Sequence, residues 1–171
     1  MLRFEHAIGP SRIPGAGLGL FTCEPIKRGR VLVVPNQAHP LCSAEDLARL
    51  PTDSIEVASS IRWFERVFTV DPEWSEESHL NHSFKPNCLW HLGFVFALED
   101  LEADAELTID YRHLLDEETV LDFRDSISGR EIRGLPWEQA IRRSSEQLAR
   151  LFAGTAAIAP SGMSGASGSK A

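Results

Sequence analysis

Short runs rich in β-branched and aromatic residues recur along the chain, and they constrain its fold more than any other feature. Gly, Pro and Asn bound most of them, which is typical of strands separated by turns. The runs cover residues 3–8, 30–34, 67–70, 89–98 and 106–110. The sequence therefore predicts a mainly β fold with few and short helices.

Two segments show helical patterns instead. Ser43 precedes acidic residues in what would be a first turn, which predicts a short helix that Pro51 ends. From Trp137 to Phe152 apolar residues recur at spacings of three and four, which predicts a C-terminal helix docked on the β body. Residues 153–171 are rich in Gly, Ser and Ala and indicate a disordered tail.

The length of 171 residues suits a single domain. Its cysteines, Cys23, Cys42 and Cys88, lack the spacing of a disulfide framework and indicate reduced thiols. No stretch approaches the ~20 apolar residues that a membrane-spanning helix needs, and the first ten residues lack the apolar run of a signal peptide. We therefore expect a cytoplasmic protein without a membrane partner.

The formal net charge of −8 is concentrated in the first part of the chain. Between Glu99 and Glu118 nine acidic residues face a single base, Arg112. Such a field disfavours direct binding of nucleic acid and favours a basic protein or peptide. A solvated acidic surface that aids solubility is the alternative.

A glycine-rich turn spans residues 14–21 (PGAGLGLF). Its glycines at alternate positions permit unusual backbone angles and let a ligand approach the main chain. It is neither a P-loop nor a dinucleotide fingerprint, because no Lys-Ser/Thr follows and Leu20 stands where a third glycine would be needed. An ordinary turn and a ligand-binding turn both stay open.

Four possible metal ligands, His79, His82, Cys88 and His91, lie close together in the sequence. Tetrahedral zinc accepts such a set, although the spacing matches no standard zinc pattern. Cys88 with either neighbouring histidine also forms a formal nucleophile and base, although such partners usually meet through the fold. A small zinc-binding module therefore remains an alternative.

Three segments in this order resemble the SET domain, the fold of protein-lysine methyltransferases that use S-adenosylmethionine. The first is the glycine turn. The second, residues 81–87 (NHSFKPN), is close to the family's Asn-His-Ser-Cys-x-Pro-Asn, and the third, residues 106–111 (ELTIDY), fits Glu-Leu-Thr-x-Asp-Tyr. The resemblance covers roughly residues 4–113 and implies small β-sheets around a knot-like crossing, with the C-terminal helix added.

The resemblance implies S-adenosylmethionine as the cofactor and Tyr111 as the catalytic residue beside the transferred methyl group. The glycine-turn backbone would hold the methionine part of the cofactor, Asn81 would bind it through its side chain, and the main chain at His82 would meet the adenine. The cofactor-binding residues so implied are Ala16, Gly17, Leu18, Gly19, Asn81, His82 and Tyr111, and Trp137 is added as a candidate for stacking on the adenine.

For the substrate, the resemblance implies a lysine-containing protein. The variable insert, residues 43–78, would form part of the substrate channel through Trp63 and Phe64, together with Ile109. Ile109 stands where many members carry Phe or Tyr, and its lack of a hydroxyl leads us to expect more than one methyl group per lysine. The chemistry needs no metal.

The chain also departs from the family pattern. Phe84 replaces a frequent cysteine, and the cysteine-rich segment that often follows the domain is absent, so the C-terminal region must close the site; such a compact form resembles bacterial members. We expect a SET domain over residues 1–115, a helical extension over 116–152 and the tail. A SET-like binding or scaffold protein without activity is the alternative. Asp104 replaces a turn glycine, and Asp tolerates the left-handed conformation.

Overall fold

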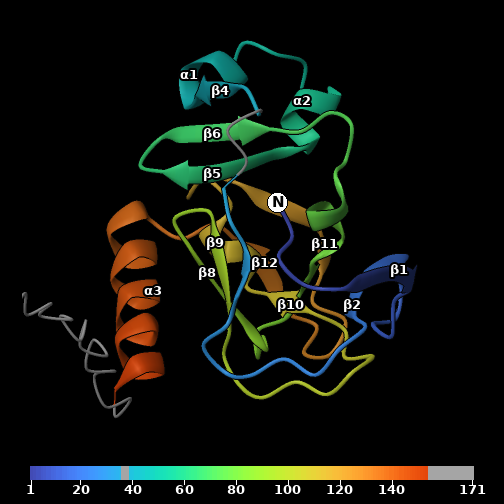
Figure 1. Ribbon diagram of the computed structural model, residues 1–171. Helices are drawn as coiled ribbons and strands as arrows, with labels where there is room; N and C mark the ends of the chain where they lie inside the picture. Colours follow the sequence, from blue (N-terminus) through green and yellow to red (C-terminus); the bar gives the residue numbers. More distant parts are fainter. Residues whose placement is uncertain (36–38, 154–171) are drawn as a thin grey trace, which may run out of the picture.

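The computed structural model describes residues 1–35 and 39–153, so nearly all of the predicted tail lies outside the described residues. The predicted class, mainly β with short helices, is confirmed (Figure 1). In chain order the elements are β1 (His6–Pro10), β2 (Leu18–Thr22), β3 (Val31–Val33), β4 (Leu41–Ser43), α1 (Ala44–Leu47), α2 (Ile55–Ala58), β5 (Ser60–Phe64), β6 (Val67–Val70), η1 (Glu76–His79), β7 (Asn81–His82), β8 (Cys88–His91), β9 (Phe94–Ala97), β10 (Thr108–Ile109), η2 (Tyr111–His113), β11 (Val120–Arg124), β12 (Glu131–Arg133) and α3 (Trp137–Phe152).

The strands form several small sheets rather than one large one. The insert builds the sheet β4-β6-β5, which lies with α1 and α2 in the upper part of Figure 1. A second sheet, β3-β9-β8, lies below it, and the hairpins β1-β2 and β11-β12 flank the body. The pair β10-β7 is parallel and joins segments far apart in the sequence.

The structure corrects two of the predicted strands. The run at 89–98 is a hairpin, because Leu92 and Gly93 both adopt positive φ angles, 51° and 83°, and reverse the chain between β8 and β9. Gly93 is required there, since a Cβ atom would lie 2.8 Å from Trp63 Nε1. The strand predicted for 3–8 is β1, which begins only at His6 and pairs with β2 across the glycine turn.

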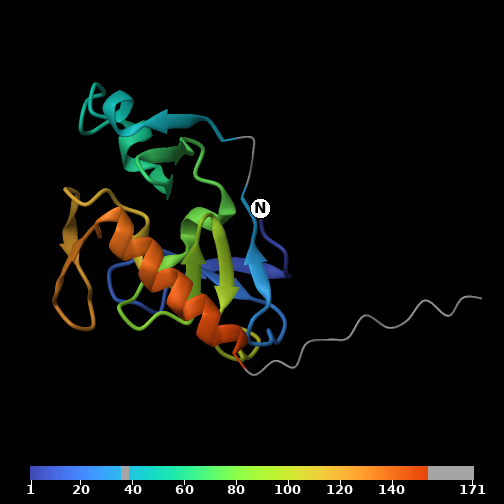
Figure 2. The ribbon, with the colours of Figure 1, turned by 90° about the vertical axis from the view of Figure 1, so that its left-hand side faces the viewer.

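Both predicted helices are present. Ser43 caps α1 by accepting a hydrogen bond from the Asp46 backbone N–H, and the Asp46 side chain accepts one in return. Helix α3 packs against β8 (Figure 2), where Ser144 Oγ lies 2.9 Å from His91 Nδ1. Asp104 has a φ of 68°, as expected from the turn it occupies.

A single hydrophobic core lies between the sheets and supports the centre of the molecule. Its fully buried side chains include Leu20 of β2, Leu32 of β3, Val95 of β9 and Leu107 just before β10. Each of these strands therefore has one face fixed by apolar burial. Among the described residues, no helix is long and apolar enough to cross a membrane.

Candidate active site

The centre of the site is the parallel pairing of β7 with β10. Asn81 lies opposite Thr108, and His82 lies opposite Ile109. The Asn87 side chain strengthens this pairing, because its Nδ2 donates to Glu106 O at 2.8 Å and its Oδ1 accepts from the Thr108 N–H at 2.8 Å. Two of the three sequence segments are thus held side by side by both backbone and side-chain hydrogen bonds.

The glycine turn joins this pair through Asn81. Asn81 Nδ2 donates to Leu18 O at 2.9 Å and to Glu106 Oε1 at 2.9 Å. Glu106 in turn accepts from Ser11 Oγ at 2.6 Å and from the Arg12 backbone N–H at 2.7 Å. The carboxylate of Glu106 therefore ties all three segments together, a role that the motif pattern alone did not indicate.

Gly19 has no room for a side chain at this junction. A Cβ atom there would lie 2.5 Å from Glu106 Oε1 and 3.2 Å from Asn81 Nδ2. The other two glycines act differently: Gly15 and Gly17 have φ angles of 82° and 74°, and the space that a Cβ atom would occupy is open at both. The turn is thus shaped by backbone freedom at its start and by close packing at its end.

A cavity of about 760 Å³ opens beside this junction, in the usual size range for small-molecule sites. The predicted residues Ala16, Asn81, His82, Tyr111, Ile109 and Trp63 all line it. Gly17, Leu18 and Gly19 follow Ala16 along the turn but are not among the described residues that line the cavity, and neither are Phe64 and Trp137. The fold thus gathers most of the predicted site around one space.

Trp137 has a different environment. The guanidinium of Arg62 lies 5.8 Å from the centroid of the Trp137 ring, at the start of α3. Arg62 itself is 2% exposed and donates to Leu135 O and His113 O. Contact of Trp137 with a cofactor stays a prediction without support from the cavity geometry.

Tyr111 lies at the end of the strand pair, as the first residue of η2. Its phenol Oη donates to Leu80 O at 2.6 Å, and burial raises the pKa of the phenol to about 12. Its backbone N–H donates to His82 Nδ1 at 3.2 Å. Burial lowers the pKa of His82, so the ring is neutral near pH 7 and carries its hydrogen on Nε2.

Several polar atoms around the cavity are buried without a hydrogen-bond partner among the described residues. They are Ser59 Oγ, Ser75 Oγ and His82 Nε2, and all three residues line the cavity. Buried polar groups are normally paired, because desolvation without compensation is costly. These atoms have almost no accessible surface, so they are enclosed in the wall of the cavity and do not face its open space.

The hairpin β11-β12 forms a wall of the cavity that the sequence analysis missed. Residues 121–126 line the cavity, as does the fully buried Ile132. Arg130 docks the hairpin on the Asn-His-Ser segment, since its guanidinium lies 4.3 Å from the Phe84 ring centroid. Most side chains of β11 are exposed, so the segment lacks the alternation that would have predicted a strand.

The proposed zinc ligands do not assemble. Among the residues that the structure describes, no group of three or more His, Cys, Asp or Glu side chains is placed to hold a metal ion. Cys88 lies in the hydrophobic core, where burial raises the pKa of its thiol to about 12, and His91 contacts Ser144 instead. The zinc module and the thiol nucleophile are therefore wrong, because the four side chains come from η1, β7 and β8 and do not meet at one point.

Comparisons with known proteins agree with this geometry. The family model described as the SET domain matches residues 17–112, and no curated protein matches the chain significantly. Similar solved structures include apo ctPRC2 with two substitutions in Ezh2 (TM-score 0.54, 17% identity) and autoinhibited ctPRC2 bound to S-adenosylmethionine (TM-score 0.52, 15% identity). A humanized mutant of the Chaetomium thermophilum Polycomb Repressive Complex 2 bound to the inhibitor GSK343 is also similar (TM-score 0.53, 16% identity).

Each of these alignments covers 84% of this chain and 22% of the other chain, so the chain spans about a fifth of the length of the proteins it matches. At such identities the likeness concerns the fold alone. The family match ends at residue 112, before the hairpin β11-β12 begins.

Proposed function

The chain belongs to the SET domain family, and we propose that it is a methyltransferase that uses S-adenosylmethionine to methylate lysine side chains of a protein substrate. One observation carries this proposal: the glycine turn, Asn81 and Tyr111 meet at the wall of one cavity. These residues come from the three segments that resemble the family motifs. Their assembly through Glu106 supports a shared function rather than three unrelated turns.

The residues around the cavity fit the proposed cofactor. Ala16 and Asn81 would hold its methionine part, and the main chain at His82 would meet its adenine, beside the hairpin residues 121–126. When bound, S-adenosylmethionine supplies a methyl group on a positively charged sulfur.

The chain's own contribution to the reaction is mainly positioning. The amine of the substrate lysine must be neutral to attack, although the reference pKa of lysine is ~10.4. Apolar walls, which include Ile109 and Leu114, disfavour the ammonium form by desolvation. Deprotonation of the incoming lysine is thus favoured by the channel itself.

Tyr111 orients the amine rather than acting as a base. Its hydroxyl hydrogen is used in the bond to Leu80 O, so its oxygen is left to accept a hydrogen bond from the substrate. With a pKa of about 12, the phenol stays protonated near pH 7 and offers no phenolate to take up a proton. The acid-rich surface would attract a basic substrate, and we propose the cytoplasm as its location.

The experiment that tests the function incubates the protein with radiolabelled S-adenosylmethionine and a cell lysate. We expect label on lysine residues with the native protein and strong loss in both Tyr111→Phe and Asn81→Ala. Phe94→Leu, at an exposed position on β9 that does not line the cavity, serves as the control and should keep full activity. Cofactor binding without any transfer would identify the inactive scaffold instead.

The same products show how many methyl groups are added. Ile109 is 3% exposed and lines the cavity beside Tyr111. Because it has no hydroxyl to hold a water molecule in the pocket, we expect lysine products with more than one methyl group. Mass spectrometry that finds only single methylation at exhaustive reaction times would contradict this expectation.

A further inference from the structure

A second pocket, with a volume of about 210 Å³, lies between α3 and η2. Among the described residues, Trp90 of β8 alone lines both this pocket and the larger cavity. Helix α3 forms one wall of the pocket with side chains at spacings of three and four residues, which lie on one face of a helix. They are Arg143, Glu146, Gln147 and Arg150. This wall is polar and charged, so the pocket suits a different kind of ligand from the cavity.

Arg112, on η2, is held in a fixed orientation at the same pocket. Its Nε and Nη2 donate to the Asp110 carboxylate at 2.9 Å and 2.6 Å, and its guanidinium lies 4.7 Å from the centroid of the Phe84 ring. All three residues line the pocket. The hydrogens on Nη1 of Arg112 have no acceptor among the described residues. Arg112 therefore keeps donors that a ligand can use, although its ion pair is complete.

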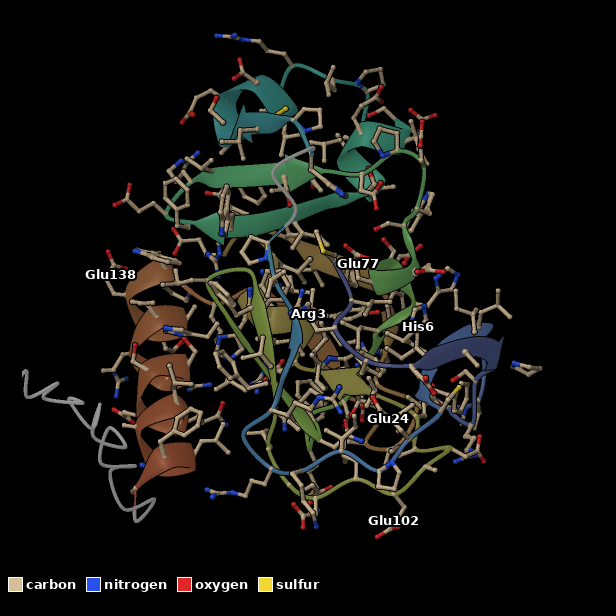
Figure 3. All side chains as sticks on the ribbon, in the orientation of Figure 1. Arg3, His6, Glu24, Glu77, Glu102 and Glu138 are labelled. Atoms are coloured by element: carbon tan, nitrogen blue, oxygen red, sulfur yellow. The ribbon has the colours of Figure 1, made fainter. Side chains whose placement is uncertain are left out.

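Arg143 carries a charge that no carboxylate of the described residues balances. It is half-buried, whereas its neighbour Arg142 is exposed and donates to Glu146 at 3.5 Å. Glu146 also lies 3.7 Å from Arg150. Glu138 is in the first turn of α3 (Figure 3), and the five positions between it and Arg143 turn the two side chains about 140° apart. A half-buried charge without a partner is costly, which favours a bound anion.

The buried imidazole of His113 adds no positive charge to the pocket that it lines. Burial lowers the pKa of His113, and the charges of Arg112 and Arg143 act in the same direction, against the effect of Asp110. The ring is therefore neutral near pH 7. The pocket is left with three arginines and two carboxylates, so it is a positive spot on a chain whose formal net charge is −8.

We propose that this pocket binds a phosphate group, with Arg143, Arg112 and Gln147 as its donors. Guanidinium groups bind phosphate and carboxylate oxygens through paired N–H donors, and the amide of Gln147 supplies two more hydrogens. The anion would balance the charge of Arg143. This site is separate from the proposed methyl transfer, because it needs neither the cofactor nor a lysine substrate.

Phosphate fits the pocket better than a carboxylate does. The donors come from two elements, η2 and α3, and therefore approach from different directions. A tetrahedral phosphate offers oxygens in several directions, whereas both oxygens of a carboxylate lie in one plane. A phosphate monoester also carries about −1.5 to −2 charges at pH 7, enough to attract Arg150 away from its long contact with Glu146. The volume admits inorganic phosphate or the end of a small monoester.

The test is isothermal titration calorimetry of the full chain at constant ionic strength. The probes are inorganic phosphate, methyl phosphate and acetate. We expect saturable binding of both phosphates, and binding of acetate at least about tenfold weaker, because acetate cannot engage donors on both walls. Tighter binding of methyl phosphate than of inorganic phosphate would assign the pocket to monoesters, and the reverse order would assign it to the free ion.

Variants on one helix separate the pocket from general charge effects. Arg143→Gln should weaken phosphate binding about tenfold, the order expected for one charge-assisted hydrogen bond, and Arg143→Lys should keep part of the affinity. Arg142→Gln is the matched control, because the Arg142 side chain is 64% exposed and does not line the pocket. It should bind phosphate like the native protein.

A further variant places a competing anion in the pocket. Gln147→Glu puts a carboxylate four residues after Arg143, where the two side chains can pair. We expect phosphate binding to be abolished while thermal stability without phosphate is unchanged or slightly higher. Loss of binding would then not result from unfolding.

Several results would overturn the proposal. They are the absence of saturable phosphate binding, acetate binding as tight as phosphate, or equal affinity losses in Arg143→Gln and Arg142→Gln. Phosphate binding that survives Gln147→Glu would also overturn it, because the site would then lie elsewhere. Selective phosphate binding in a protein that transfers no methyl group would support the pocket and refute only the proposed activity.

Discussion

Tyr111 donates its phenol hydrogen to the backbone carbonyl of Leu80 at 2.6 Å. Leu80 directly precedes β7, and Tyr111 lies two residues beyond β10, so this bond joins the start of one parallel strand to the segment that follows the other. It fixes the direction of the hydroxyl before any ligand arrives. The oxygen lone pairs are consequently turned toward other partners, which is the arrangement that a positioning role requires.

Titration of this phenol is the first prediction. Burial raises the pKa of Tyr111 to about 12 from a usual value of 10.0, and Tyr111 is the single tyrosine of the chain, so tyrosinate absorbance reports this group alone. We expect a midpoint near 12 in the folded protein. The Tyr111→Phe variant supplies the background absorbance, and circular dichroism on the same samples confirms that the protein stays folded. A titration midpoint at pH 10 would contradict the burial of the phenol.

The sign of the accompanying stability change follows from this shift. Above a pH of about 10 the unfolded chain loses the phenol proton while the folded chain retains it. The free energy of unfolding should therefore fall as the pH rises from about 10 to about 12. Tyr111→Phe should remove this part of the alkaline slope.

Substitution of Gly19 tests the junction of the three segments. In Gly19→Ala the new Cβ would meet Glu106 Oε1 at 2.5 Å, and that carboxylate is held by several hydrogen bonds and cannot easily move. We expect a loss of about 1–3 kcal/mol in the free energy of unfolding, typical of overpacking, together with weaker cofactor binding.

Gly9→Ala in the same hairpin is the matched control. Its nearest neighbour would be a Phe21 ring atom at 3.8 Å, which is an ordinary contact. Denaturation and cofactor titration should leave Gly9→Ala close to the native protein. Equal effects of the two substitutions would show that the hairpin is destabilised by any added methyl group. The close contact of residue 19 with Glu106 would then not be the cause of the loss.

The sequence was informative where local chemistry decides the structure. The Ser43 cap, the amphipathic pattern of α3 and the turn at Asp104 depend on neighbouring residues, and all three are confirmed. The roles of Glu106 and Arg130 depend on contacts with residues far away in the sequence, so no local pattern could reveal them. Recognition of the site required the order of three motifs rather than any one of them.

The substitution Phe123→Ala tests whether the hairpin β11-β12 covers the bound cofactor. Phe123 is 50% exposed on β11 and lines the cavity, where its ring is available to stack on an adenine. We expect Phe123→Ala to weaken binding of S-adenosylhomocysteine roughly tenfold, the order of one lost base–aromatic stack. Isothermal titration calorimetry measures this change.

Two further variants make the cofactor assay specific. Ile127 lies in the loop between β11 and β12, is 79% exposed and does not line the cavity, so Ile127→Ala should bind normally. Trp137→Ala tests the prediction made from the sequence. A loss of affinity there, with none in Phe123→Ala, would assign the cover to α3 instead of the hairpin.

Arg62 connects the insert to the region around Tyr111. It is 2% exposed, and besides its side-chain bonds to Leu135 O at 2.9 Å and His113 O at 3.3 Å, its backbone N–H donates to Leu114 O at 2.7 Å. Arg62→Met keeps the apolar stem but leaves two carbonyls without their donor. We expect the free energy of unfolding to fall by about 3 kcal/mol.

The control for Arg62 lies in the turn between β5 and β6. Arg66 pairs with Glu45 at the surface and its side chain is 62% exposed, so Arg66→Met should change stability by less than about 1 kcal/mol. Urea denaturation of both variants gives the comparison. Similar losses of stability in the two variants would show that the buried Arg62 contributes no more to stability than the exposed Arg66.

The last prediction concerns stability in weak acid. Burial lowers the pKa values of His82, His91 and His113 below the usual 6.5. A lowered pKa means that the unfolded chain takes up protons first as the pH falls, so stability is retained above about pH 6.5 and lost progressively below it. We expect the urea midpoint to drop between about pH 7 and about pH 5, and His113→Asn to flatten that slope. A midpoint that stays constant over this range would mean that the three imidazoles protonate as readily in the folded chain as in water.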